Sequence, residues 1–213
     1  MKQVHVPGGV TLLTLLALGG CASSPPMRFY TLSAGETSAA SSGVLPAIRV
    51  ARVKLPGEID RAELVQRIDA NRVRLAEQDR WAAPLDDMIR RTLSADLQAR
   101  ATSSGAATSP GAATSPGAVA SPGATASPGA APAGGGPSIL SVDVEEFIGD
   151  ATCAVSLRAA WELKAPDATA PAMHGYESIR VSPPPTCDVS ALPGAMSQAL
   201  AELSDRIVRA SVR

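Results

Sequence analysis

Apolar and polar residues alternate along much of the second half of the chain, and this alternation predicts β-strands. Leu140, Val142 and Val144 occupy every second position, and the stretch 155–163 alternates in the same way. Successive side chains of a strand point to opposite faces, so each strand has one apolar and one polar face. We expect a hairpin over 140–163 with its turn at 148–151, followed by a third strand that carries Ile179 and Val181.

Shorter strands are predicted in the first half of the chain. One covers 29–32. A second covers 48–55, and because its alternation changes phase we expect a bulge near Ala51-Arg52. The stretches 64–68 and 73–76 flank Asp69-Ala70-Asn71, a turn-forming sequence that indicates another hairpin.

Two stretches repeat apolar residues at helical spacing. The first begins at Pro84, a residue that suits the first turn of a helix. The second covers 190–210. The apolar stripes of the two helices are Leu85, Ile89, Leu93 and Leu97, and Met196, Leu200, Leu203 and Ile207. The order of strands, helix, strands and helix predicts an α+β domain, in which two helices pack on one face of a largely antiparallel sheet.

A low-complexity block separates the first helix from the later strands. Residues 101–137 are nearly all Ala, Gly, Ser, Thr and Pro, and Ser-Pro-Gly recurs every six residues from Ser109. Such repeats carry almost no large apolar side chains, so stacking them would bury too little surface to offset the entropy of ordering the chain. We expect a disordered loop that interrupts one domain spanning 28–213.

The N-terminus is typical of a lipoprotein signal peptide. Lys2 precedes an apolar run over 10–18, which is shorter than the roughly 20 residues that span a bilayer. Leu18-Gly19-Gly20-Cys21 follows and resembles a lipobox, in which a peptidase cuts before the cysteine and acyl chains are attached to it. We expect removal of residues 1–20, lipidation of Cys21 and a tether over 21–27. The alternative is an ordinary signal peptide that a cysteine happens to follow.

Charge and composition exclude some classes of function. Removing Lys2 leaves 18 basic and 20 acidic residues, because the chain has 19 and 20, so the mature net charge is −2. This balance argues against nucleic-acid binding, which favours a strongly basic face. No apolar run after the leader reaches membrane-spanning length, so the lipid would be the only anchor.

The candidate chemical groups do not form a recognisable active site. His174 is the only histidine after residue 20 and lies in an expected loop, where a solvated role is commoner than catalysis. Cys153 and Cys187 lack metal-ligand spacing, and no phosphate-binding loop is present. Asp143, Glu145 and Glu146 are best interpreted as a solvated strand face. We therefore assign no catalytic, cofactor-binding or metal-binding residue.

Two further pairs of residues have alternative interpretations. Cys153 and Cys187 are the only thiols left once Cys21 is acylated, and export to an oxidising compartment would favour a disulfide between them. Alternatively, Cys153 is a buried thiol and Cys187 lies too far away. Trp81, beside Arg80, is either a packing anchor for the start of the helix or, with Arg80, a contact for a partner.

Several segments together resemble the PqiC-like family of auxiliary lipoproteins in ABC-type and MCE-type envelope transport. They are Phe29-Tyr30-Thr31-Leu32-Ser33, Ile59-Asp60-Arg61-Ala62-Glu63-Leu64, Asp79-Arg80-Trp81-Ala82-Ala83-Pro84-Leu85 and Val142-Asp143-Val144-Glu145-Glu146-Phe147. The resemblance implies a non-catalytic accessory subunit on the periplasmic face of the outer membrane. Its implied partners are a periplasmic MCE-domain protein and an inner-membrane transporter. Ala22 after the lipid site favours outer-membrane delivery.

One departure from the family pattern concerns the region after the first helix. Family members carry a short strand with a Tyr-Pro-Trp-like signal there, whereas this chain has the Ser-Pro-Gly repeats. Two other functions stay open. One is a structural envelope lipoprotein that binds cell-wall polymer or another assembly, and the other is a small hydrolase that uses a serine or His174.

Overall fold

The computed structural model describes residues 25–35, 47–106, 136–183 and 185–212, and every structural statement below concerns these residues. The strands are β1 (Arg28–Tyr30), β2 (Ile48–Lys54), β3 (Glu63–Arg67), β4 (Val73–Trp81), β5 (Ser138–Asp150), β6 (Val155–Lys164) and β7 (Met173–Val181). The helices are α2 (Leu85–Ala106) and α3 (Leu192–Ser211), with a short 3-10 turn, η2 (Val189–Ala191), before α3.

The strands form one mixed sheet in the order β1-β4-β3-β5-β6-β7, and β2 also pairs with β5. The pairs β3·β4, β5·β6 and β6·β7 are antiparallel. The pairs β1·β4, β2·β5 and β3·β5 are parallel, so the expectation of a largely antiparallel sheet was wrong. The physical reason is the length of β5, whose first half pairs with β2 and whose last residues pair with β3 along the same edge.

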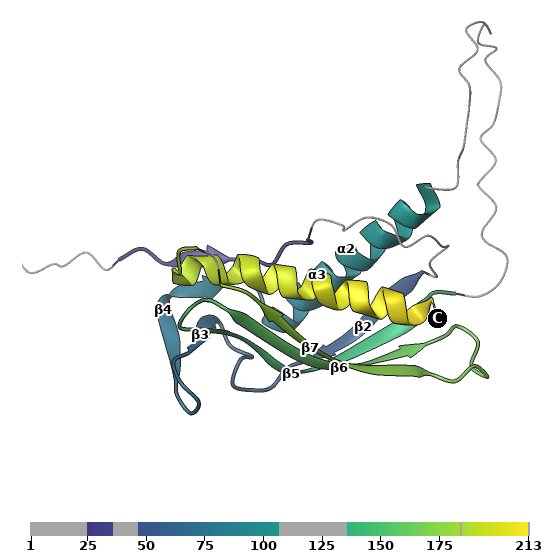
Figure 1. Cartoon of the computed structure of the whole chain (residues 1–213), viewed down its shortest axis with the longest axis horizontal. Coiled ribbons are helices and arrows are strands. Elements are labelled where there is room, and N and C mark those ends of the chain that lie inside the picture. The colour runs from purple at the N-terminus through teal and green to yellow at the C-terminus, as the bar shows by residue number, and fades with distance from the viewer. Residues whose placement is uncertain (1–24, 36–46, 107–135, 184, 213) are drawn as a thin grey trace, which may run out of the picture.

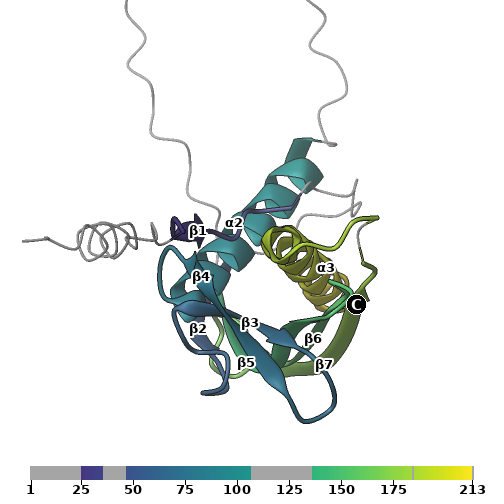
Figure 2. The ribbon, with the colours of Figure 1, turned by 90° about the vertical axis from the view of Figure 1, so that its left-hand side faces the viewer.

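Both helices lie on one face of the curved sheet (Figures 1 and 2). Helix α2 covers β2, helix α3 covers β5 to β7, and the two helices also contact each other. The two predicted apolar stripes are buried in the core between helices and sheet, which confirms the α+β class and the orientation of both helices. The opposite, outer face of the sheet carries charged side chains.

The hairpins agree with the sequence in kind but not in every boundary. The β3–β4 hairpin and the bulge in β2, between Val50 and Arg52, were both predicted. Strand β5 continues through Asp150, so the turn before β6 lies later than the predicted 148–151. His174 lies in β7, opposite Glu162 of β6, and not in a loop.

The low-complexity block lies mostly outside the described residues. Its predicted start, Ala101, falls inside α2, which continues to Ala106. Residues 107–135 and the lipidation site Cys21 are not among the described residues. Figure 1 shows that β1 lies at one end of the molecule, whereas the C-terminal end of α2 and the first residues of β5 lie at the other end.

A buried arginine joins the two helices. Arg100 of α2 donates hydrogen bonds to the Asp96 carbonyl at 2.8 Å and to the Ala201 carbonyl of α3 at 2.8 Å. Its guanidinium also pairs with the carboxylates of Asp96 and Asp205. Because a buried guanidinium requires hydrogen-bond partners, this cluster fixes how α2 and α3 meet.

The segment after β1 runs across the same two helices. The Ser33 amide donates to the Ser197 hydroxyl of α3 at 3.1 Å, and the Gly35 amide donates to the Asp96 carboxylate of α2 at 2.9 Å. A Cβ at Gly35 would lie 2.5 Å from the Cβ of Ala201, so only glycine fits this close approach. The N-terminal segment is thus fastened to the helices as well as to the sheet.

Candidate functional site

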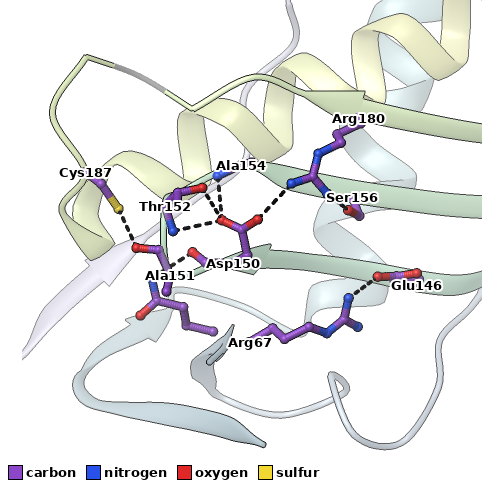
Figure 3. Close-up of polar contacts among 10 residues, drawn as sticks. Arg67, Glu146, Asp150, Ala151, Thr152, Ala154, Ser156, Arg180 and Cys187 are labelled. Atoms are coloured by element: carbon purple, nitrogen blue, oxygen red, sulfur yellow. Dashed lines mark hydrogen bonds and ion pairs between the residues drawn. The ribbon is translucent and has the colours of Figure 1, made fainter. Parts of the chain in front are cut away.

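The turn between β5 and β6 is built around the carboxylate of Asp150 (Figure 3). One carboxylate oxygen accepts hydrogen bonds from the Thr152 amide at 2.8 Å, the Thr152 hydroxyl at 2.6 Å and the Ala154 amide at 3.1 Å. The other accepts from Arg180 of β7 at 2.9 Å. Burial raises the pKa of Asp150, but these hydrogen bonds outweigh it and hold the pKa below its usual value.

Cys153 follows in the same turn with a φ of 65°, the only non-glycine residue at positive φ among those described. Its amide donates to the Asp150 carbonyl at 2.9 Å, which closes a β-turn that ends in a left-handed residue, a conformation that glycine usually adopts. The Cys153 side chain is buried and is bonded to the exposed Cys187, with the two Cα atoms 5.5 Å apart. The bridge joins the turn to the loop that leads into η2 and α3.

Glu146 lies on the outer face beside the β5 bulge and is nearly buried. Its carboxylate pairs with Arg67 of β3 and, at 2.8 Å, with Arg158 of β6. A groove of about 230 Å³ passes this group, between the loop that contains Ile59 and the tip of the β3–β4 hairpin. The predicted solvated carboxylate face therefore holds for Asp143 and Glu145 but not for Glu146, because the register shift between Val144 and Glu146 turns that side chain toward two arginines.

A wider depression of about 720 Å³ crosses the outer face where β2, β5, β6 and β7 meet. Its lining mixes both signs of charge, and Lys54 pairs with Asp143 while Lys164 pairs with Glu162. His174 is exposed at its rim. Such a surface of exposed, mostly paired charges suits contact with another macromolecule.

Arg80 and Trp81, the predicted partner contacts, point to opposite faces of β4. Trp81 is 6% exposed and packs in the core against Leu85 and Phe147, so it is a packing anchor for the start of α2. The Arg80 side chain is 40% exposed and lies 3.4 Å from Glu63. The structure therefore leaves Arg80 available on the surface and removes Trp81 from it.

Strand β1 is held by a buried carboxylate that the sequence analysis did not single out. Asp79 of β4 accepts hydrogen bonds from Arg28 and from the Tyr30 hydroxyl, each at 2.9 Å, and the Arg28 Nε lies 2.7 Å from the same carboxylate. Burial and the hydrogen bond to Asp79 both raise the pKa of Tyr30. Asp79 belongs to a segment that carries the family resemblance, but its partner Arg28 lies 51 positions away, so sequence spacing gave no signal.

Neither a cluster of metal ligands nor a membrane-spanning helix is found in the described part of the chain. Within it, no group of three or more His, Cys, Asp and Glu side chains could hold a metal ion. None of its helices is both long enough and apolar enough to cross a membrane.

Solved structures share this arrangement of a mixed sheet with two helices on one face. One is the crystal structure of an uncharacterized protein, 18% identical, which matches with a TM-score of 0.62 over 87% of this chain and 98% of that chain. Another is a Xanthomonas campestris protein of family DUF330, 16% identical, with a TM-score of 0.59 over 85% of this chain and 92% of that chain. At these identities the likeness shows the fold alone.

The family is shown by the sequence itself. The family model for the ABC-type transport auxiliary lipoprotein component matches residues 30–208. The chain belongs to this family, which confirms the PqiC-like resemblance. No curated protein matches the chain.

Proposed function

We propose that this protein is a lipid-anchored, non-catalytic accessory subunit of an MCE-type or ABC-type lipid-transport complex, on the periplasmic face of the outer membrane. The family match over residues 30–208 carries the proposal, because that family consists of auxiliary lipoproteins of ABC-type transport systems. The partners would be a periplasmic MCE-domain protein and, through it, an inner-membrane transporter.

The outer face of the domain suits docking to another macromolecule. The outer face presents exposed ion pairs around a broad, open depression, as protein-binding rims do. The strands that carry this depression are held together by backbone pairing in one sheet. A rigid surface loses little conformational entropy on binding, which favours its use as a docking platform.

The lipid anchor is tested at Cys21. Mass spectrometry of the mature N-terminus should find an acylated cysteine, because Leu18-Gly19-Gly20 precedes it. Cys21→Ser should release the domain from membranes while its unfolding curve stays that of the wild type. A wild-type protein that is cut elsewhere and stays soluble would contradict the anchor.

The partner is tested by photocrosslinking in intact envelopes. A photoreactive amino acid in place of His174 would sit at the rim of the outer-face depression, and the same amino acid in place of the exposed Val212 would sit at the end of α3. We expect the His174 position to capture a protein with an MCE domain. Capture of cell-wall polymer at His174 would favour the structural envelope lipoprotein instead.

A further inference from the structure

Two exposed apolar residues lie where the chain enters the fold, one inside β1 and one just before it. Phe29 of β1 is 65% exposed and Met27 is 42% exposed, although both are large apolar side chains. Arg28 and Tyr30, the neighbours of Phe29 in the strand, both turn toward Asp79. Because successive side chains of a strand alternate, their bonds to Asp79 hold Phe29 on the opposite face, turned to solvent.

A cation lies next to this pair. Phe29 is aligned with Arg80 in the parallel pairing of β1 and β4, so their side chains share one face of the sheet. The Arg80 side chain is 40% exposed, and one of its terminal nitrogens lies 3.4 Å from the Glu63 carboxylate. Its Nε is buried and has no hydrogen-bond partner among the described residues, so only the outer end of the guanidinium is open to solvent. Met27, Phe29 and Arg80 together form what we call the β1 patch.

The position of the β1 patch in the chain places it close to a bilayer. If Cys21 is acylated, Phe29 is eight positions and Met27 six positions after the lipidated residue. A fully extended chain spans at most about 3.5 Å per residue, so Phe29 stays within roughly 28 Å of the lipid attachment point. An apolar patch on so short a tether meets the membrane surface at a high effective concentration.

We propose that the β1 patch is a second membrane contact, in which Phe29 and Met27 insert at the bilayer interface and Arg80 lies among the phosphate headgroups. The inference rests on the proposed lipidation of Cys21. Aromatic and apolar side chains beside a cation are the usual composition of such interfacial contacts. The lipid alone would tether the domain in any orientation, whereas the added contact fixes which end faces the membrane.

The patch would set the orientation of the whole domain. Strand β1 lies at one end of the molecule, and the C-terminal end of α2 and the start of β5 lie at the other (Figure 1). Contact through the β1 patch therefore points the C-terminal end of α2 and the start of β5 away from the bilayer. Residues 107–135 connect these two elements in the sequence.

Tryptophan quenching in vesicles tests the proposal. The mature protein, produced in cells that process lipoproteins and extracted from their membranes, is reconstituted in vesicles of phosphatidylethanolamine and phosphatidylglycerol with brominated acyl chains. Phe29→Trp reports on the β1 patch, and Tyr176→Trp is the matched control, because Tyr176 is 54% exposed on β7. The native Trp81 and Trp161 are buried and supply the same background in both variants.

We expect Phe29→Trp to shift its emission to shorter wavelength and to be quenched by brominated lipid, while Tyr176→Trp shows neither change. Flotation with the vesicles reports on the anchor separately. Protein that floats without quenching at Phe29→Trp would overturn the β1 patch and leave the anchor standing. Protein that does not float would overturn the anchor, and the β1 patch with it.

Discussion

Asp96 and Asp150 carry the same side chain in opposite electrostatic surroundings. Asp96 is buried between α2, α3 and the Gly35 segment, and one of its carboxylate oxygens has no hydrogen-bond partner among the described residues. Burial raises the pKa of Asp96 more than the Gly35 amide and Arg100 lower it. Asp150 accepts several hydrogen bonds, and its pKa is lowered in spite of burial. The difference arises from hydrogen bonding to the charged form.

The two residues should therefore give opposite pH dependences of stability. The raised pKa of Asp96 adds most to the free energy of unfolding below about pH 4, where the carboxyl is protonated. This stabilisation is lost as the pH rises through the folded-state pKa. Asp150, with its lowered pKa, contributes above its unfolded pKa and loses that contribution as the pH falls. Above about pH 4, rising pH should stabilise Asp96→Asn relative to the wild type, and below about pH 4, rising pH should destabilise Asp150→Asn relative to the wild type. Urea unfolding of all three proteins measures this, and equal slopes for both variants would contradict it.

Cys153 combines a disulfide with a backbone conformation that suits glycine. A residue with a side chain costs about 1–2 kcal/mol in the left-handed region. In a Cys187→Ser background, which removes the bridge, Cys153→Gly should thus be more stable than Cys153→Ala by about 1 kcal/mol. Chemical unfolding of the two variants decides the question, and Ala as stable as Gly would show that φ is not strained there. In the wild type, non-reducing peptide mapping should find Cys153 linked to Cys187.

At the scale of elements, the attachment of β1 to the sheet depends on the carboxylate of Asp79. Asp79→Ala removes the partner of both Arg28 and Tyr30, and losing hydrogen bonds to a buried charged group costs about 2–3 kcal/mol. Asp143→Ala is the matched control, because it breaks the exposed pair with Lys54 and should cost less than about 1 kcal/mol. Hydrogen exchange should show loss of protection in β1 for Asp79→Ala alone. Equal destabilisation by the two variants would show that Asp79 does not hold the strand.

Local sequence patterns predicted where the helices and strands lie better than they predicted which strands pair. The apolar stripes of α2 and α3 and the β2 bulge depend on neighbouring residues, and each appears in the structure. The parallel pairing of β2 and β3 with β5 depends on segments far apart in sequence, which periodicity does not encode. The same limit applies to the site. The Arg67–Glu146 and Arg28–Asp79 pairs join residues 79 and 51 positions apart.

At the scale of the whole molecule, the low-complexity block should be dispensable for folding. Its composition offers almost no large apolar side chains, and each halving of a loop changes the closure entropy by only about 0.6 kcal/mol. Deleting most of residues 107–135, with a short connection kept between α2 and β5, should leave cooperative unfolding nearly unchanged. A Gly-Ser segment of the original length is the control for loop length. Loss of the cooperative transition in the deletion alone would show that the block is structural.

The anchoring of β1 also has a mechanical consequence. If the lipid end and a bound partner are pulled apart, tension along the tether reaches the Arg28–Asp79 bonds before it reaches any core residue. β1 pairs with β4 through only three residues, whereas the disulfide ties the β5–β6 turn covalently to the loop before α3. Under load, β1 would peel away while the rest of the domain stayed folded, lengthening the link between membrane and partner without releasing either.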